Sequence, residues 1–195
     1  MRMAKFLLAV SVVGLSACSA QTGIETSGAA GVPPLELMAT GETVPVGTTA
    51  RDAADDPAIW RNAADPSKSL VIGTDKRAGL YVFGMDGAKK SFLPEGELNN
   101  VDLREVTIDG RKTVLVGASI RNDRDNAYIG LYTLDTDSAE LTPLGKYPAG
   151  AGEAYGFCFG QDAAGETFAY MITKAGNVRE MKLSFAGGAP NASVK

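Results

Sequence analysis

Three parts of the sequence after residue 55 repeat one layout, and this repeat limits the possible folds more than any other feature. The plainest copies are the segments Gly79-Leu80-Tyr81-Val82-Phe83 and Gly130-Leu131-Tyr132-Thr133-Leu134. A looser copy starts at Asn177, so the copies start at positions 79, 130 and 177, which are 51 and then 47 residues apart. Each is a short apolar run bounded by turn residues, and no long helical period of apolar residues appears after residue 20. The sequence therefore predicts an all-β domain.

Two further strands are expected before each of these segments. The first strands are predicted at 55–60, 99–104 and 153–158, and the second strands at 70–73, 114–117 and 168–172. A period of about 50 residues with about four strands in each unit is typical of a β-propeller, in which each unit is one blade of antiparallel strands. A β-sandwich with accidental self-similarity is the alternative.

The repeats fill only part of an ordinary propeller. Propellers have about four to eight blades, whereas the sequence contains two complete units and most of a third. Residues 191–195 come where the fourth strand of the third unit should begin. We therefore expect about three blades of four antiparallel strands, as the truncated N-terminal part of a longer propeller.

The composition excludes several kinds of chemistry. The 195 residues include no histidine, which excludes Ser–His–Asp hydrolysis, histidine phosphatase chemistry and His-ligated zinc. A formal net charge of −4 argues against a nucleic-acid partner. A cysteine phosphatase needs an arginine six residues after its cysteine, but Ala164 stands there, so we expect Cys158 to be a small buried apolar residue. Any hydrolysis must then rely on carboxylates, cations and bound metal.

Residues 1–17 have the features of a lipoprotein-type signal peptide. Basic residues precede a short apolar run, and Leu15-Ser16-Ala17-Cys18 resembles the bacterial lipobox. Cys18 is then expected to be lipidated; ordinary cleavage, with Cys18 removed or without a role, is the alternative. We expect an exported protein, anchored in the outer membrane as a lipoprotein or else periplasmic or secreted. Residues 18–42 are predicted to be a flexible tether and residues 43–195 the propeller domain, with a strand at 43–46.

The blade layout predicts that acidic and basic residues meet at one end of the strands. In a four-stranded antiparallel blade, the turn before the first strand and the loop after the second strand lie at the same end. These turns and loops contain Asp55, Asp56, Asn100, Asp102 and Glu153, and the cations Lys76, Arg77, Arg121, Arg124 and Lys174. Carboxylates suit calcium and cations suit a polyanion, so the pattern predicts metal-assisted phosphate binding. Solvated surface ion pairs are the alternative.

Five segments in order resemble the β-propeller phytases, the alkaline, calcium-dependent phytase family. They are Asp55–Trp60, Ile72–Lys76, Gly79–Val82, Leu98–Asp102 and Tyr155–Cys158, and the resemblance extends over about residues 43–185. It implies a six-bladed propeller that hydrolyses phytate, with bound calcium as the cofactor and an activated water as the nucleophile. It also implies a phosphoric monoester hydrolase of the 3-phytase type.

The resemblance implies roles for individual residues. Asp56, with the backbone carbonyl of Val101, is similar to part of a calcium site, and Asp55 stands beside it as a further ligand or as an acid that supports the ligands. The family positions that hold substrate phosphates are matched by Lys76, Arg121, Tyr155 and Lys174, and Arg77 stands where another basic residue is common. Ala175 departs from the family, which often has an acid at that position. The catalytic, water-activating acids are expected in later blades.

The expected partner is phytate or another phosphorylated small molecule. We expect a monomer that contacts a membrane only through its N-terminal lipid. Two alternatives to a phytase stay open: a non-catalytic surface propeller that binds a phosphorylated ligand or a protein, and a related phosphodiesterase or sugar-phosphate hydrolase.

Overall fold

The computed structural model describes residues 35–49, 52–187 and 189–194. The predicted signal peptide, the lipidation site Cys18 and most of the predicted tether lie outside these ranges. Residues Ala39–Lys195 form one compact unit, separate from Met1–Met38. Within the described ranges, no helix is long and apolar enough to span a bilayer.

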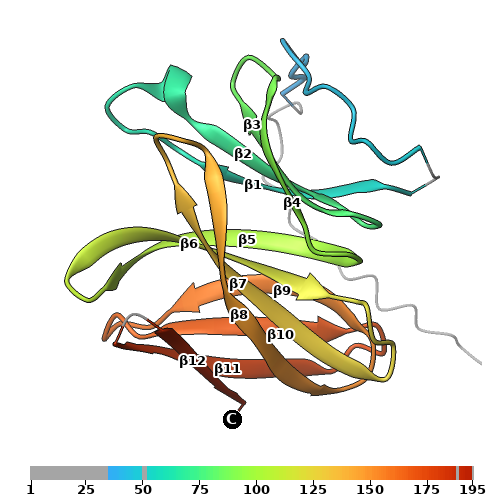
Figure 1. The fold of residues 1–195 in the computed structure, drawn as a ribbon, viewed down its shortest axis with the longest axis vertical. Coiled ribbons are helices and arrows are strands. Elements are labelled where there is room, and N and C mark those ends of the chain that lie inside the picture. The colour runs from blue at the N-terminus through green and yellow to red at the C-terminus, as the bar shows by residue number, and fades with distance from the viewer. Residues whose placement is uncertain (1–34, 50–51, 188, 195) are drawn as a thin grey trace, which may run out of the picture. The chain divides into compact units, whose positions relative to one another are not determined.

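Three antiparallel sheets make up the compact unit, and each consists of four strands that follow one another in the chain (Figure 1). The first blade contains β1 (Ala54–Trp60), β2 (Leu70–Asp75), β3 (Gly79–Gly84) and β4 (Lys89–Pro94), with a short 3-10 helix at Pro66–Lys68. The second contains β5 (Leu98–Ile108), β6 (Arg111–Ile120), β7 (Asn126–Asp135) and β8 (Glu140–Ala151). The third contains β9 (Ala154–Gln161), β10 (Thr167–Thr173), β11 (Val178–Ala186) and β12 (Ala189–Val194). The predicted all-β fold with propeller-like blades is confirmed.

The third blade is more complete than the sequence suggested. Its fourth strand, β12, pairs with β11 in a regular antiparallel register that includes Ser184 opposite Asn191 and Leu183 opposite Ala192. The expectation that the chain ends before this strand was wrong, because Ala189-Pro190 already belongs to it and follows the turn at Gly187 closely.

Two smaller expectations were also wrong. Residues 43–46 form no strand, although the Val44 amide donates to the Gly87 carbonyl (2.9 Å) and so holds this segment against the first blade. Cys158 is exposed, not buried. Alternate residues of a strand face opposite sides of the sheet. Phe157 and Phe159 point into the core, so Cys158 between them points away from it.

The second sheet lies between the other two, and its residues alternate between two cores. Val114 and Val116 of β6 pack toward the first blade with Ile72, while Leu115 between them packs toward the third blade with Met171. Val116, Leu115, Ile72 and Met171 are all fully buried. A run of consecutive apolar residues is therefore needed in β6, since both faces of this sheet are covered.

Close contact between the second and third blades depends on a glycine. A Cβ atom at Gly117 would lie 2.5 Å from the rings of both Phe157 and Phe159. These two rings pack edge to face with their centroids 5.0 Å apart. Without a side chain at Gly117, the aromatic pair can rest on the backbone of β6.

Carboxylates join the first strands of neighbouring blades. The Asp56 Oδ2 atom accepts a hydrogen bond from the Val101 amide of β5 (3.0 Å), and the Asp102 Oδ2 atom accepts one from the Phe159 amide of β9 (2.7 Å). The first strands of separate sheets have no ladder between them, so these bonds give otherwise unpaired amides an acceptor. They also fix the spacing of the blades on the side where the first strands lie.

Replacing Asp102 with alanine should lower the free energy of unfolding by about 1–3 kcal/mol, because the part-buried Phe159 amide loses a charged acceptor. Urea denaturation followed by far-UV circular dichroism measures this difference. The matched control is Asp137→Ala in the exposed β7–β8 turn, where a change below about 0.5 kcal/mol is expected. Equal stability of the two variants would show that the hydrogen bond does not stabilise the contact between blades.

Candidate functional site

One backbone hydrogen bond recurs in all three blades and places a cation in each. The amide of Lys76 donates to the Ala53 carbonyl (2.7 Å), that of Arg121 to the Glu97 carbonyl (2.8 Å), and that of Lys174 to the Glu153 carbonyl (2.9 Å). Each bond ties the loop after a second strand to the turn before the first strand of the same sheet. Lys76, Arg121 and Lys174 therefore occupy equivalent positions, as the sequence repeat predicted.

In the first blade, Lys76 lies between two carboxylates. Its Nζ atom is 2.7 Å from Asp52 Oδ1 and 3.1 Å from Asp55 Oδ1, and its side chain is only 11% exposed. The hydrogen bond to Asp52 is the largest cause that raises the pKa of Lys76, and the same bond lowers the pKa of Asp52. The two carboxylates hold the lysine in its charged form and limit its motion.

In the second blade, Arg121 is held on three sides. Its Nε and Nη2 atoms donate to Glu153 Oε1 (3.2 and 2.6 Å), and its Nη1 atom donates to Asn99 Oδ1 (2.9 Å). The guanidinium carbon lies 5.7 Å from the centroid of the Tyr155 ring. A cation above an aromatic face is favourable, so Tyr155 of the third blade fixes the plane of an arginine from the second.

Glu153 forms ion pairs with cations of two blades. Besides Arg121, its carboxylate contacts the Nη1 atom of Arg124 (2.5 Å) and the Nζ atom of Lys174 (3.5 Å). These cations, led by the hydrogen bond from Arg121, lower the pKa of Glu153 from 4.5 to about 2. Glu97 plays a similar part, because it pairs with Arg77 (3.4 Å) and with Arg124.

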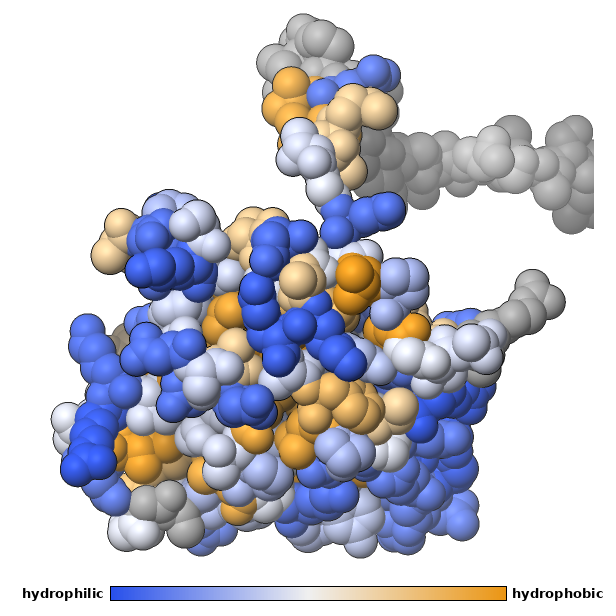
Figure 2. Space-filling model, turned by 45° about the horizontal axis from the view of Figure 1, so that its top comes forward, coloured by the Kyte–Doolittle hydropathy of each residue, from blue (hydrophilic) through white to orange (hydrophobic). Residues whose placement is uncertain are grey.

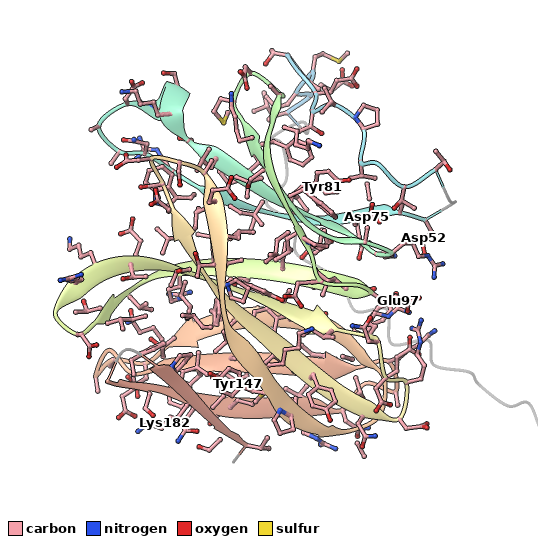
Figure 3. The ribbon with its side chains drawn as sticks, in the orientation of Figure 1. Asp52, Asp75, Tyr81, Glu97, Tyr147 and Lys182 are labelled. Atoms are coloured by element: carbon pink, nitrogen blue, oxygen red, sulfur yellow. The ribbon has the colours of Figure 1, made fainter. Side chains whose placement is uncertain are left out.

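We call this group of side chains the charged edge. Its described members are five cations and four carboxylates, namely Lys76, Arg77, Arg121, Arg124, Lys174, Asp52, Asp55, Glu97 and Glu153. Asp52 and Glu97 lie on the same side of the sheets in Figure 3, and Figure 2 shows hydrophilic side chains gathered on that side of the molecule. The carboxylates in this cluster offset the repulsion between its cations.

The structure brings together most of the residues that the sequence singled out. Asp55, Lys76, Arg77, Arg121, Tyr155 and Lys174 all belong to or touch the charged edge. Asp56 and Val101 are also adjacent to each other, but the Asp56 carboxylate and that of Asp102 bond to backbone amides outside the cluster of ion pairs. Asp52 and Glu97 were missed, since neither belongs to a repeated segment, and Glu153 was recognised only as an acid in a turn.

A buried carboxylate stabilises the loop that contains Lys76 and Arg77. Asp75 is fully buried, and its Oδ1 atom accepts a hydrogen bond from the Arg77 amide (3.0 Å). The Ala78 amide donates to the Asp75 carbonyl (3.2 Å) and closes the turn. Both cations therefore project from a rigid backbone.

Comparison with known proteins identifies the family. The profile of the phytase family matches residues 4–192. The chain belongs to the phytase family. It is similar to the 3-phytase of Bacillus subtilis (strain 168), with 31% identity over 193 residues that cover 96% of this chain and 50% of the relative. The chain thus spans about half the length of that curated phytase.

Calcium is typical of β-propeller phytases, but the described residues provide only part of a calcium site. Calcium takes about six to eight oxygen ligands, with several carboxylates among them. Among residues 35–49, 52–187 and 189–194, no three acidic side chains are grouped so that they could hold a metal ion. Asp55 is paired with Lys76, and Asp56 accepts the Val101 amide. These residues of the phytase chain do not fit a complete calcium site by themselves.

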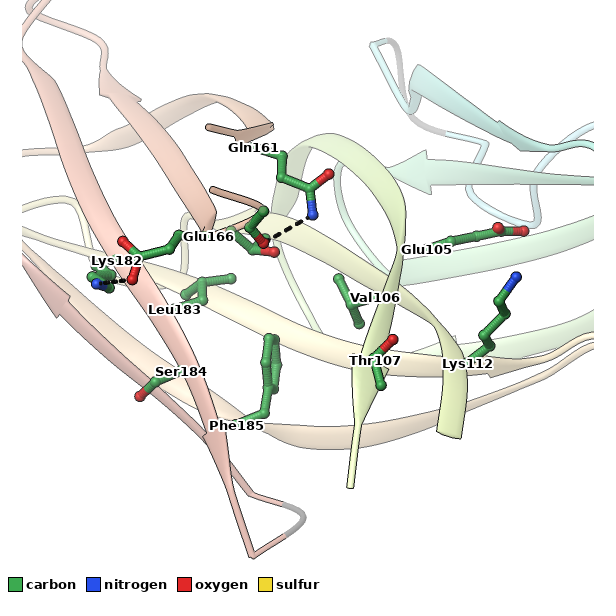
Figure 4. Close-up of a pocket in the computed structure, with 12 residues that line it drawn as sticks. Glu105, Val106, Thr107, Lys112, Gln161, Glu166, Lys182, Leu183, Ser184 and Phe185 are labelled. Carbon is green, nitrogen blue, oxygen red and sulfur yellow. Dashed lines mark hydrogen bonds and ion pairs between the residues drawn. The ribbon is translucent and has the colours of Figure 1, made fainter. Parts of the chain in front are cut away.

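A hollow lies at the opposite end of the strands from the charged edge, and Figure 4 shows the residues that line it. It lies between the end of β5 and the β9–β10 turn, next to the C-terminal half of β11. Two of its charged side chains pair with each other, since Lys182 Nζ lies 2.5 Å from Glu166 Oε1. The uncharged Gln161 donates a hydrogen bond to the Gly165 carbonyl (3.0 Å). Lys112 and Lys182 are the only cations among the described residues that line this hollow, so we place the candidate site at the charged edge.

The low pKa of Glu153 gives a pH-dependent contribution to stability. Because the folded-state pKa is below the ordinary value, ionised Glu153 stabilises the fold above about pH 4.5, and this stabilisation is lost as the pH falls through about 2. Glu153→Gln should therefore be less stable than the unmodified phytase chain at pH 7, by about 1 kcal/mol after solvent screening. The difference should shrink between pH 4.5 and pH 2. Urea denaturation across this range tests it, and a carboxyl ¹³C titration with its midpoint near the ordinary value would contradict it.

Proposed function

We propose that the protein to which this chain belongs is a phytase of the 3-phytase type, which hydrolyses phosphomonoesters of myo-inositol hexakisphosphate. The observation that carries the proposal is the recurrence of one fixed cation in each of three blades, at Lys76, Arg121 and Lys174, on one edge of the sheets. Membership of the phytase family and the similarity to a 3-phytase support it.

The charged edge suits a substrate with several phosphates. Arg121 presents a fork of N–H donors whose plane is fixed by Tyr155, and such a fork matches phosphate oxygens. Lys76 and Lys174 supply compact charges from the blades on either side. Tyr155 is 42% exposed, so its hydroxyl is accessible to a phosphate oxygen. Several phosphates on one ring can then contact cations of different blades at the same time.

In this proposal the chain contributes positioning and charge stabilisation. Cations held before the substrate arrives need no rearrangement when negative charge shifts during phosphoryl transfer. These 195 residues contain no histidine, so none of them can supply covalent catalysis by histidine. Desolvation by the surrounding residues is the main cause that raises the pKa of the Cys158 thiol, and the charge of Asp102 raises it further, whereas that of Arg104 lowers it. We therefore assign no covalent phospho-enzyme to a residue of this chain.

We further propose that activity requires calcium, to which this chain contributes Asp55, Asp56 and the Val101 carbonyl. The proximity of Asp56 to Val101 supports that assignment. When bound, calcium would neutralise phosphate charge and favour attack by water. The described residues do not complete its ligand set, so no step of the reaction is assigned to the metal here.

We also propose that the protein is exported, acts as a monomer and is anchored in the outer membrane through lipidated Cys18. The basic, apolar and lipobox-like segments of residues 1–18 support this location. Incorporation of radiolabelled palmitate that is lost in Cys18→Ser tests it, and equal labelling of both proteins would contradict it.

Phosphate release from phytate by the protein at its natural length tests the proposed activity. Lys76→Gln should lower kcat/KM at least about tenfold, because a cation fixed by two carboxylates leaves the site. The matched control is Lys68→Gln, which removes a lysine that is 73% exposed at the far end of the first blade, and it should retain full activity.

Three other outcomes of the same assay are informative. Release that continues after calcium is chelated would contradict the calcium requirement. Phytate that binds and is not hydrolysed would favour a non-catalytic propeller for phosphorylated ligands. Selective hydrolysis of phosphodiesters or sugar phosphates would favour the related hydrolases.

A further inference from the structure

The loop between β6 and β7 belongs to the second blade and lies at the charged edge. It is held at both of its ends. Asn122 Oδ1 accepts the Glu97 amide at the start of the second blade (2.7 Å), and the Gly152 amide before the third blade donates to the Asp125 carbonyl (2.7 Å). Inside the loop, Asp123 Oδ1 accepts the amides of Asp125 and Asn126 (2.8 and 3.0 Å). The loop therefore holds its side chains at a defined place.

Arg124 lies at the centre of this loop and differs from Arg121 in how it is held. Its guanidinium bridges two carboxylates, Glu153 through Nη1 (2.5 Å) and Glu97 through Nη2. Its side chain is 45% exposed, whereas that of Arg121 is 14% exposed. The ring contact at this edge belongs to Arg121, above Tyr155. Among residues 35–49, 52–187 and 189–194, only the carboxylates of Glu97 and Glu153 are ion-pair partners of Arg124.

We propose that Arg124 is a further phosphate-binding residue, which exchanges Glu97 and Glu153 for a substrate phosphate that lies between the second and third blades. The inference rests on the proposed function. An exposed ion pair is worth about 0–1 kcal/mol, so a phosphate dianion can replace either carboxylate at small cost. The guanidinium fork that now spans two carboxylates can bind two oxygens of one phosphate.

The exchange gives Glu97 a definite role. Glu97 contacts Arg77 and Arg124, and its carboxylate occupies guanidinium N–H donors that could otherwise bind a phosphate. It neutralises both cations in the free protein and competes with the substrate for them. Glu153 is different, because Arg121 and Lys174 also hold it and would keep it in place after Arg124 leaves. Removal of the Glu97 charge should therefore strengthen phytate binding, whereas removal of the Arg124 charge should weaken it.

Isothermal titration of phytate into the protein in calcium-free buffer tests these opposite signs. Arg124→Gln should raise Kd about five- to tenfold, since one charge-assisted contact is lost. Arg124→Lys should show a smaller increase, because it keeps the charge but not the fork. Glu97→Gln should lower Kd by about threefold or more. In the Arg124→Gln background the gain from Glu97→Gln should be smaller, because Glu97 then competes only for Arg77.

The matched control is Arg111→Gln, in which an exposed arginine at the far end of the second blade is removed and Kd should stay unchanged. Far-UV circular dichroism confirms that each variant is folded. If Lys76→Gln raises the Kd for phytate but Arg124→Gln has the same Kd as Arg111→Gln, this inference is overturned and the proposed function is not. Weaker binding by Glu97→Gln would also overturn it. If the unmodified protein binds no phytate in this buffer but hydrolyses it when calcium is present, this inference fails and the proposed function does not. If it neither binds nor hydrolyses phytate, both fail.

Discussion

The candidate site depends on one hydrogen bond that each blade repeats, from the amide of a basic residue to the carbonyl of the turn before the first strand. It joins Lys76 to Ala53, Arg121 to Glu97 and Lys174 to Glu153 over 2.7–2.9 Å. Because the sheets pack face to face, the same local bond in three sheets brings the three cations to one edge. The repeated backbone hydrogen bond thus places three positively charged side chains in one cluster.

That cluster is tolerable only because carboxylates lie within it. Asp52 and Asp55 flank Lys76, and Glu153 contacts cations of two blades. These pairs join side chains that are mostly covered, such as Lys76, Arg121 and Glu153, and they fix the positions of the cations. In the proposed function, Glu97 and Glu153 compete with a substrate phosphate for Arg124. In that proposal the charged edge combines a preorganised anion site with carboxylates that compete for it.

Much of the fold could be predicted because its signals are local. Strand periodicity and the repeated Gly-Leu-Tyr segment located the blades, and their spacing placed Lys76, Arg121 and Lys174 at one end. The errors arose where a long-range contact decides the outcome. Cys158 is exposed because its neighbours Phe157 and Phe159 take the core face against Gly117, and Glu97 enters the charged edge through Arg124, 27 residues later in the chain.

The sequence by itself determined the all-β class, the first three strands of each blade and the identity of the cations, since each follows from residue type and short-range period. Only the tertiary structure decided which carboxylate meets which cation. Salt-bridge partners such as Arg121 and Glu153 belong to different sheets, and their pairing depends on how closely Gly117 and the Asp102 hydrogen bond let those sheets approach. Packing distance between blades, which no local pattern encodes, sets the electrostatics of the site.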